Sequence, residues 1–298
     1  MKKINYITIL SLIICTICSC QKESDSRNEL PLPTSSDSIY LDKIYITSGS
    51  ITIDTFETVT ITYDAQKRVT SMVSSFSASS TITKRSYTYS YIGSDTLPFK
   101  TTFYLEENSG KDTAITFHFY DATSRNLKDS SLTSHFSLIS GNYSIRNIIT
   151  NYTYDVGKKY AYGINEFPLS PTNNYIRKDT ATVDANDNIT LTKGYFPDFP
   201  GPGFVQRTNS VIAYDNKINP FRLLSNFKAH QQLPSGETLF FDYLPNNNIT
   251  STTETQGGSS PLTTTYTYTY KTNGLPSVAD VIFDGTDFYK IYYTYKKL

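Results

Sequence analysis

The chain has 298 residues, and its 27 basic and 27 acidic side chains give a formal net charge of zero. Nucleic-acid binding requires a clustered excess of Lys and Arg, and the sequence has no such cluster, so we expect no nucleic-acid partner. Hydrophobic residues make up 38% of the chain and aromatic residues 14%, which is too much core-forming material for a disordered protein.

The N-terminal residues are organised as a secretory signal. Lys2 and Lys3 precede a mostly apolar stretch, residues 7–17, which is too short to span a bilayer as a permanent helix. The segment Ile17-Cys18-Ser19-Cys20 resembles the lipobox of bacterial lipoproteins, in which the last cysteine is lipidated. The resemblance implies cleavage after residue 19 and a lipid on Cys20. The alternative is an ordinary signal peptide with incidental cysteines.

All three cysteines, Cys15, Cys18 and Cys20, lie in this region. A mature chain that begins at Cys20 keeps one cysteine, whose sulfur carries the lipid. We therefore expect no intramolecular disulfide, no thiolate metal site and no catalytic thiol. Acyl chains on one cysteine anchor a protein stably, because each buried CH₂ contributes about 0.8 kcal/mol, so the membrane is an expected partner.

Residues 20–38 are polar, contain Pro31 and Pro33, and show no hydrophobic periodicity, which predicts a flexible tether. The polar, partly acidic start of this segment resembles the surface-export signal of Bacteroidetes lipoproteins. That resemblance implies an outer-membrane protein exposed on the cell surface. The expected organisation is a signal peptide over residues 1–19, a tether over 20–38 and one folded domain over 39–298.

From Ile39 onward, β-branched or aromatic residues alternate with Thr and Ser. Residues 264–270 read Thr-Thr-Tyr-Thr-Tyr-Thr-Tyr, which places three tyrosines on one face of a strand and threonines on the other. Threonine suits a wetter face, because its branched Cβ favours extended backbone and its hydroxyl tolerates water. The same alternation recurs in residues 58–63, 86–91, 113–119, 149–154 and 290–295.

Many of these strands end at an aromatic residue followed by a turn-forming cluster. Examples begin at Tyr63, Tyr120 and Tyr270, and an apolar residue about six positions later starts the return strand. The markers fall at positions 63, 91, 120, 154, 183, 214, 243, 270 and 295. Such a repeat holds two strands of roughly nine to ten residues and two turns, which predicts about sixteen or more strands. The predicted fold is all-β, a long antiparallel meander of repeated hairpins that forms a curled sheet or open barrel.

Segments such as Tyr63–Ser71 resemble the YD repeats of RHS-type proteins. The whole pattern, over most of residues 40–298, resembles Bacteroidetes surface lipoproteins of unknown function that are built from such hairpins. YD repeats usually carry glycine four residues after the tyrosine, and only Gly274 matches that position. The resemblance implies an architecture and no particular activity.

The sequence contains few groups that could carry chemistry. His118, His135 and His230 lie on separate repeats, and we interpret His118 as a residue on the face of a sheet. The motifs G-x-S-x-G, H-E-x-x-H and the P-loop do not occur, and we expect no metal or other cofactor. Asp184–Asn188 has spaced oxygen ligands like a calcium loop, but Ile189 stands where such a loop needs glycine, so we predict a hairpin turn there.

The most suggestive binding feature is the segment Gly194–Phe204. Its three prolines and three glycines predict an irregular loop that presents four aromatic residues. These candidate ligand-binding residues are Tyr195, Phe196, Phe199 and Phe204. Stiff aromatic loops stack on sugar rings or anchor proteins. The alternative is that the rings cover an open end of the sheet.

These features favour a lipid-anchored, non-enzymatic envelope protein that binds a glycan or a protein, or serves as a structural module. Whether any enzymatic activity exists stays open, because a surface glycosidase would need only a pair of carboxylates lining one cleft. An outer-membrane barrel is a third alternative, since its strands also alternate. The abundance of Thr opposite Tyr argues against that alternative, because it would place hydroxyl groups toward lipid or a packed interior.

Overall fold

The computed structural model describes residues 39–48, 54–76, 82–122, 126–155, 157–166, 175–186, 188–198, 203–224, 245–285 and 287–298. These residues form sixteen strands and one short 3₁₀ helix. The elements are β1 (Ile39–Ser48), β2 (Asp54–Tyr63), β3 (Val69–Phe76), β4 (Ile82–Ser90), β5 (Lys100–Glu107), β6 (Gly110–Tyr120), β7 (Asn126–Ser137), β8 (Tyr143–Asp155), β9 (Lys158–Glu166), β10 (Tyr175–Val183), β11 (Ile189–Pro197), β12 (Phe204–Ile218), η1 (Pro220–Leu223), β13 (Asn247–Gln256), β14 (Leu262–Tyr270), β15 (Pro276–Phe283) and β16 (Asp287–Lys297).

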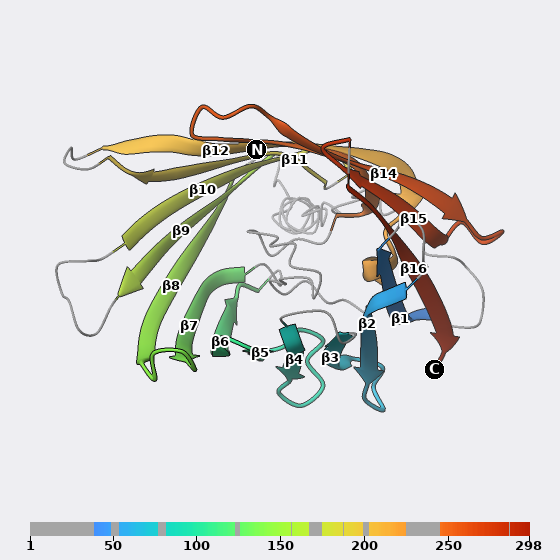
Figure 1. Cartoon of the computed structure of the whole chain (residues 1–298), viewed down its shortest axis with the longest axis horizontal. Coiled ribbons are helices and arrows are strands. Elements are labelled where there is room, and N and C mark those ends of the chain that lie inside the picture. The colour runs from blue at the N-terminus through green and yellow to red at the C-terminus, as the bar shows by residue number, and fades with distance from the viewer. Residues whose placement is uncertain are drawn as a thin grey trace, which may run out of the picture.

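The strands form one closed barrel (Figure 1). Each strand pairs antiparallel with the next in the chain, and β16 returns to pair with β1. Ile44 of β1 lies opposite Tyr293 on one side and Val59 on the other. The predicted all-β antiparallel meander of repeated hairpins is confirmed, and the pairing of its first and last strands closes the sheet, which the sequence left open. Closure pairs the backbone groups that two free edge strands would leave unsatisfied.

The turns alternate between the two ends of the barrel. The turns that follow Tyr63, Tyr120 and Tyr270 share one end, which we call the tyrosine end. The first and last strands also begin and finish there, because Ile39 pairs with Lys297. The turn between β11 and β12 lies at the opposite end, which we call the distal end.

A tyrosine hydroxyl closes the open end of five hairpins. Tyr63 Oη donates to the carbonyl oxygen of Leu41 at 2.6 Å, and Tyr91 Oη donates to that of Val69 at 2.7 Å. The same bond joins Tyr120 to Pro98, Tyr214 to Ile189 and Tyr295 to Pro276. Each tyrosine stands at a marker position of the sequence repeat. Burial raises the pKa of Tyr63, Tyr91, Tyr214 and Tyr295, which keeps each phenol protonated and able to donate.

An aspartate organises the turn that follows such a marker. Asp64 Oδ1 accepts from the backbone N–H groups of Gln66 and Arg68, both at 2.9 Å. Asp184 Oδ1 accepts in the same way from Asn186 at 2.9 Å and Asn188 at 2.8 Å. The interpretation of Asp184–Asn188 as a hairpin turn is therefore confirmed, because its carboxylate closes the turn.

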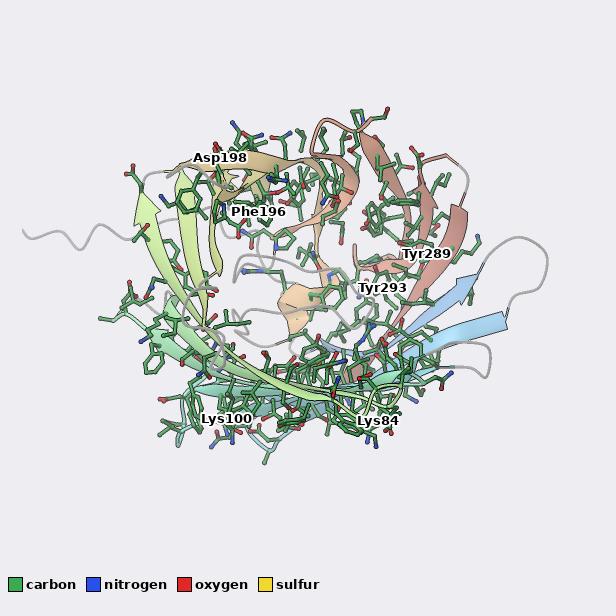
Figure 2. The ribbon with its side chains drawn as sticks, turned by 60° about the vertical axis from the view of Figure 1, so that its left-hand side comes forward. Lys84, Lys100, Phe196, Asp198, Tyr289 and Tyr293 are labelled. Atoms are coloured by element: carbon green, nitrogen blue, oxygen red, sulfur yellow. The ribbon has the colours of Figure 1, made fainter. Side chains whose placement is uncertain are left out.

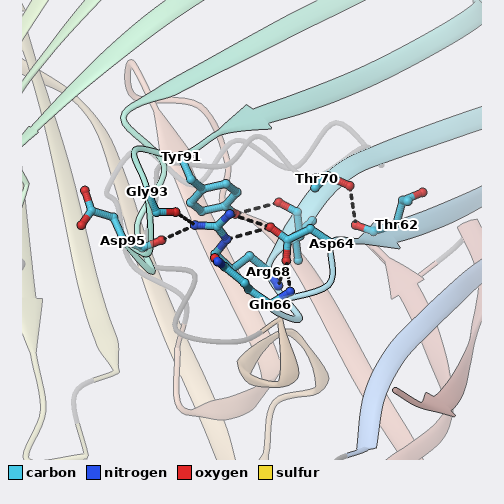
Figure 3. A network of polar contacts seen from close by, with 9 residues as sticks. Thr62, Asp64, Gln66, Arg68, Thr70, Tyr91, Gly93 and Asp95 are labelled. Carbon is cyan, nitrogen blue, oxygen red and sulfur yellow. Dashed lines mark hydrogen bonds and ion pairs between the residues drawn. The ribbon is translucent and has the colours of Figure 1, made fainter.

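Arg68 ties the turn between β2 and β3 to the neighbouring loop (Figure 3). Its guanidinium forms an ion pair with Asp64 at 2.7 Å and donates to the carbonyl oxygens of Gly93 and Asp95 at 2.8 and 2.9 Å. The same group lies 4.3 Å from the centre of the Tyr91 ring. Adjacent repeats are thus joined by one side chain at the tyrosine end.

The inner face of the barrel holds the apolar core. Buried residues include Leu41, Ile44, Ile46, Val59, Ile61, Val69, Met72, Tyr87, Tyr89, Leu224, Ala279, Val281 and Tyr293. Partly buried tyrosines of β14 and β16 pack against them. Figure 2 shows Tyr289 and Tyr293 directed into the barrel, whereas Lys84 and Lys100 lie on its outer side.

The outer face of β2 to β5 and of β14 is mainly hydroxylic. Its paired outward positions carry Thr58, Thr60, Thr62, Ser71, Ser75, Lys84, Ser86, Thr88, Ser90, Lys100, Thr102, Thr265, Thr267 and Thr269, together with Val73, Tyr104 and Glu106. Exposed large apolar residues on outward positions are most numerous on β6 to β8, namely Ile115, Phe117, Phe119, Leu132, Tyr143 and Ile145, and also include Val73 on β3, Val211 on β12 and Ile282 on β15. The two faces of the wall therefore differ in polarity.

The short helix η1 enters this core. Asn219 caps it by accepting from the backbone N–H of Phe221 at 2.9 Å, and Pro220 follows as the first helical residue. Leu223 and the next residue, Leu224, are buried. The similar segment Ile164-Asn165-Glu166 continues β9 to Glu166 instead. Both segments begin with Ile-Asn, and Pro220 distinguishes the one that forms a helix from the one that continues as a strand.

Candidate functional site

The predicted aromatic loop is shorter than expected. Strand β11 continues through Gly194, Tyr195 and Phe196 to Pro197, and β12 begins at Phe204. The expectation that all four aromatic residues ride on an irregular loop is therefore wrong. Regular pairing of Tyr195 with Gln206 and of Pro197 with Phe204 holds this segment in the sheet. A glycine and a proline are tolerated because they lie toward the end of the strand.

The structure separates the candidate aromatics by face. Successive residues of a strand point to opposite sides, so Tyr195 and Phe196 cannot share a ligand. Figure 2 shows Phe196 directed into the barrel. Tyr195 pairs with Lys178 of β10 and shares the outer face with Phe204. Phe199 and Cys20 lie outside the described residues.

Tyr195, Lys178 and Phe204 form one patch near the distal end, which we call the outer aromatic patch. The Lys178 Nζ atom lies 4.2 Å from the centre of the Phe204 ring, a cation–π contact that holds the lysine chain across β11. Lys178 and Gln206 are exposed, whereas both rings are half-buried. The patch therefore combines ring surface with hydrogen-bond donors, as surfaces that bind sugars or protein side chains do.

A second polar cluster lies on the inner wall around His118. Its Nε2 atom is 2.8 Å from Thr101 Oγ1, and its Nδ1 atom is 2.7 Å from Asp129 Oδ1. Tyr152 donates to the other oxygen of Asp129 at 2.9 Å. The four residues come from four adjacent strands, β5 to β8, and all are buried.

The order hydroxyl, imidazole, carboxylate in this cluster matches that of a hydrolase triad. A nucleophile must, however, be reached by its substrate, and Thr101 and His118 are each only 6% exposed. The cluster satisfies its own buried polar atoms and so holds four strands together. The interpretation of His118 as a sheet-face residue is confirmed, but its partners could not be found from sequence, since they stand 17 and 11 residues away on other strands.

Metal ligands do not converge in the part of the chain that the structure describes, where no group of three or more His, Cys, Asp or Glu side chains could hold an ion. Several of the described carboxylates have structural partners instead. Asp64 and Asp184 close turns, and Asp129 holds His118. Among the described residues, no helix has the length and apolar character needed to cross a bilayer.

Together these observations define a closed antiparallel β-barrel of sixteen described strands with an apolar core on its inner face. The fold is similar to that of a porin-like protein from Bacteroides vulgatus, with a TM-score of 0.54 and 12% identity over 87% of this chain and 99% of that chain. A porin-like protein from Bacteroides uniformis is 16% identical over 86% of this chain and 96% of that chain, with a TM-score of 0.47.

The first of these two comparisons shows a shared fold, and identities this low show the fold alone. The all-β architecture is thus shared with a protein from Bacteroides, which agrees with the expected resemblance to Bacteroidetes proteins at the level of architecture. No protein-family model matches the chain, and no curated protein matches it either.

Proposed function

We propose that the protein is a lipid-anchored barrel of the outer membrane that stands in water at the cell surface and binds a glycan or an envelope protein. The polarity of the barrel wall carries this proposal. Barrels that span a membrane place apolar side chains outward and line a polar interior. Here the outward positions of β2 to β5 and β14 carry mainly Thr, Ser and Lys, while the apolar core lies inside.

The exposed apolar residues on the outer face do not change this argument. Most of them lie on three neighbouring strands, β6 to β8, and Val73, Val211 and Ile282 lie on β3, β12 and β15, whereas a lipid-embedded barrel needs an apolar band around its whole circumference. The tether also fits a barrel outside the membrane. Residues 20–38 lead to the tyrosine end, and a flexible chain of this length has an average end-to-end distance of about 25 Å.

Detergent phase partitioning tests where the barrel resides. A variant that starts at Gln21 lacks Cys20 and is expected to enter the aqueous phase as a folded monomer. The full chain is expected to enter the detergent phase and to incorporate labelled palmitate, and Cys20→Ser should abolish the label. If the shortened variant needs detergent to stay dispersed, or forms conducting pores in planar bilayers, the barrel spans the membrane and the proposal is wrong.

The outer aromatic patch is the proposed binding surface. Replacing Tyr195 or Phe204 by Ala should weaken binding on a glycan array or in a pull-down of envelope proteins by tenfold or more, because each removes ring surface beside Lys178. Phe196→Ala is the matched control, since that ring points inward (Figure 2). Equal binding by the Tyr195→Ala variant and the unmodified protein would remove this patch from consideration.

A further inference from the structure

The polarity of the wall at β6 and β7 is the reverse of that at β2 to β4. The inward positions of β6 and β7 are mainly polar, and their side chains bond to one another across the two strands. These bonded pairs are Thr116 with Ser131, His118 with Asp129, and Asp112 with His135. An antiparallel sheet with one polar face normally packs its other face against an apolar partner. The apolar side of this part of the wall therefore lies outside the barrel.

Six apolar residues on the outer face of β6 to β8 form one stripe, which we call the outer apolar stripe. Their side chains are between 37% and 60% exposed, and Ile115 lies directly opposite Leu132. Measured along the strands, the stripe extends about 26 Å, from near the tyrosine end to near the distal end. The six residues are Ile115, Phe117, Phe119, Leu132, Tyr143 and Ile145. A patch of this extent marks an interaction surface.

Lysines border the outer apolar stripe. Lys100 of β5 lies opposite Phe117 on the outer side of the barrel (Figure 2). Lys128 of β7 lies opposite Phe119, and its Nζ atom is 5.6 Å from the centre of that ring. Among the described outward positions that pair β6 with β7 and β7 with β8, no acidic residue occurs. The partner of this surface should therefore be apolar and carry negative charge.

These charges disfavour a second copy of the chain as the partner. Two stripes packed against each other would bring Lys100 and Lys128 of both copies together, with no acidic side chain on the facing positions to balance them. Glu106 of β5 already forms an ion pair with Lys111 at 2.8 Å. Like charges in an apolar contact oppose association, so the stripe needs a different partner.

A membrane with anionic lipids supplies both required features, an apolar layer and phosphate groups at its surface. Lysine chains can reach phosphate while neighbouring rings enter the boundary of the acyl chains. We propose that the outer apolar stripe lies against an anionic lipid surface, with Lys100 and Lys128 at the phosphates. The barrel then rests on its side, because the stripe runs along the strands, and the remaining wall stays in water.

This contact is separate from the outer aromatic patch and does not depend on a lipid at Cys20. The chain from Gln21 onward contains every described strand and lacks that cysteine, so it reports the contact alone. It should co-sediment with vesicles of equal parts phosphatidylcholine and phosphatidylglycerol at least tenfold more tightly than with phosphatidylcholine vesicles, without releasing a trapped dye. Dye release would show a spanning barrel and contradict the proposed function as well. Absence of binding to the mixed vesicles would overturn this inference alone.

Phe117→Ser tests the apolar part of the contact. The variant should bind the mixed vesicles at least fivefold more weakly, because a ring that enters the lipid is lost. Val211→Ser on β12 is the matched control, since Val211 is also exposed and lies outside the stripe. Melting temperatures check that both variants remain folded. Equal binding by the two variants would overturn the proposal.

Lys100→Glu tests the charge. It should weaken binding to the mixed vesicles at least tenfold and change binding to phosphatidylcholine little, whereas Lys193→Glu on the outer face of β11 should leave both unchanged. Sedimentation equilibrium without vesicles examines the other partner. A monomer supports the lipid contact. A dimer that Phe117→Ser converts to a monomer would mean that a second copy covers the stripe, and the lipid proposal would be wrong.

Discussion

At the scale of single residues, a tyrosine and an aspartate stabilise different parts of a hairpin repeat. The tyrosine of each closed hairpin donates from its hydroxyl to a carbonyl about 22 residues earlier, as Tyr63 does to Leu41. In the first hairpin, Asp64 follows the tyrosine and accepts two backbone N–H groups of the turn. The marker spacing could be predicted from sequence, but the role of the hydroxyl could not, because it depends on which carbonyl the register brings near.

Tyr63→Phe tests the hydroxyl alone. The carbonyl oxygen of Leu41 belongs to a fully buried residue, and losing its donor should lower the free energy of unfolding by about 1–2 kcal/mol. Urea denaturation measures the loss. Tyr292→Phe is the control, because that ring lies on the outer face, opposite Tyr45, and its replacement should change stability by less than about 0.5 kcal/mol. Equal losses in the two variants would contradict the assigned role.

Asp64 makes the same end of the barrel sensitive to acid. Burial acts to raise the pKa of its carboxyl, but the hydrogen bonds and charge of Arg68 and the N–H of Gln66 outweigh burial and lower it. A group whose pKa is lower in the folded state contributes stability above its unfolded pKa and loses that contribution as pH falls through the folded value.

The unmodified protein should therefore lose stability below about pH 4, the ordinary range of an aspartate. Asp64→Asn should be less stable at neutral pH and should lose less between pH 6 and pH 3. Urea midpoints measured across that range provide the comparison. Parallel curves for the two proteins would show that the Asp64 charge does not stabilise the turn.

At the scale of elements, the positions of the hairpin turns could be predicted best from the sequence. Contacts between residues of different strands could be predicted least. The expected turn at Asp184 formed as a turn, whereas the segment at Tyr195 and Phe196 formed strand because pairing with β10 and β12 overrides the local effect of glycine and proline. The His118 cluster was equally hidden, since it is assembled from several strands.

Gly110 illustrates a requirement of one hairpin that sequence pattern does not reveal. A Cβ at this position would overlap the backbone carbonyl oxygen of Phe136 on β7, which cannot move without breaking the β6–β7 pairing. Gly110→Ala should therefore destabilise the protein by about 1–3 kcal/mol. Gly203→Ala is the matched control, because open space surrounds that position. Thermal unfolding of both variants gives the result, and a Gly110→Ala protein as stable as the control would be inconsistent with this packing.

At the scale of the whole molecule, closure could not be read from the sequence. Every other pairing joins neighbours in the chain, but β1 and β16 are separated by the entire folded domain. Hydrophobic periodicity predicts which face of a strand points inward, but it does not predict pairing with a strand about 250 residues away. Zero net charge and the abundance of Tyr and Thr are compatible with both an open and a closed sheet.

A disulfide between β1 and β16, the two strands whose pairing closes the barrel, tests closure directly. Tyr45 and Tyr292 are paired on the outer face, and directly opposite strand residues lie at a distance that a disulfide can bridge. In a chain that starts at Gln21, no native cysteine remains to compete. Tyr45→Cys combined with Tyr292→Cys should oxidise completely to a monomer that migrates faster in a non-reducing gel. Because the bond closes a very long loop, it should stabilise the fold by up to about 5 kcal/mol. The control combines Tyr45→Cys with Thr102→Cys, which lies on β5, and should remain reduced. If the Tyr45→Cys, Tyr292→Cys protein also remains reduced, β1 and β16 are free edges.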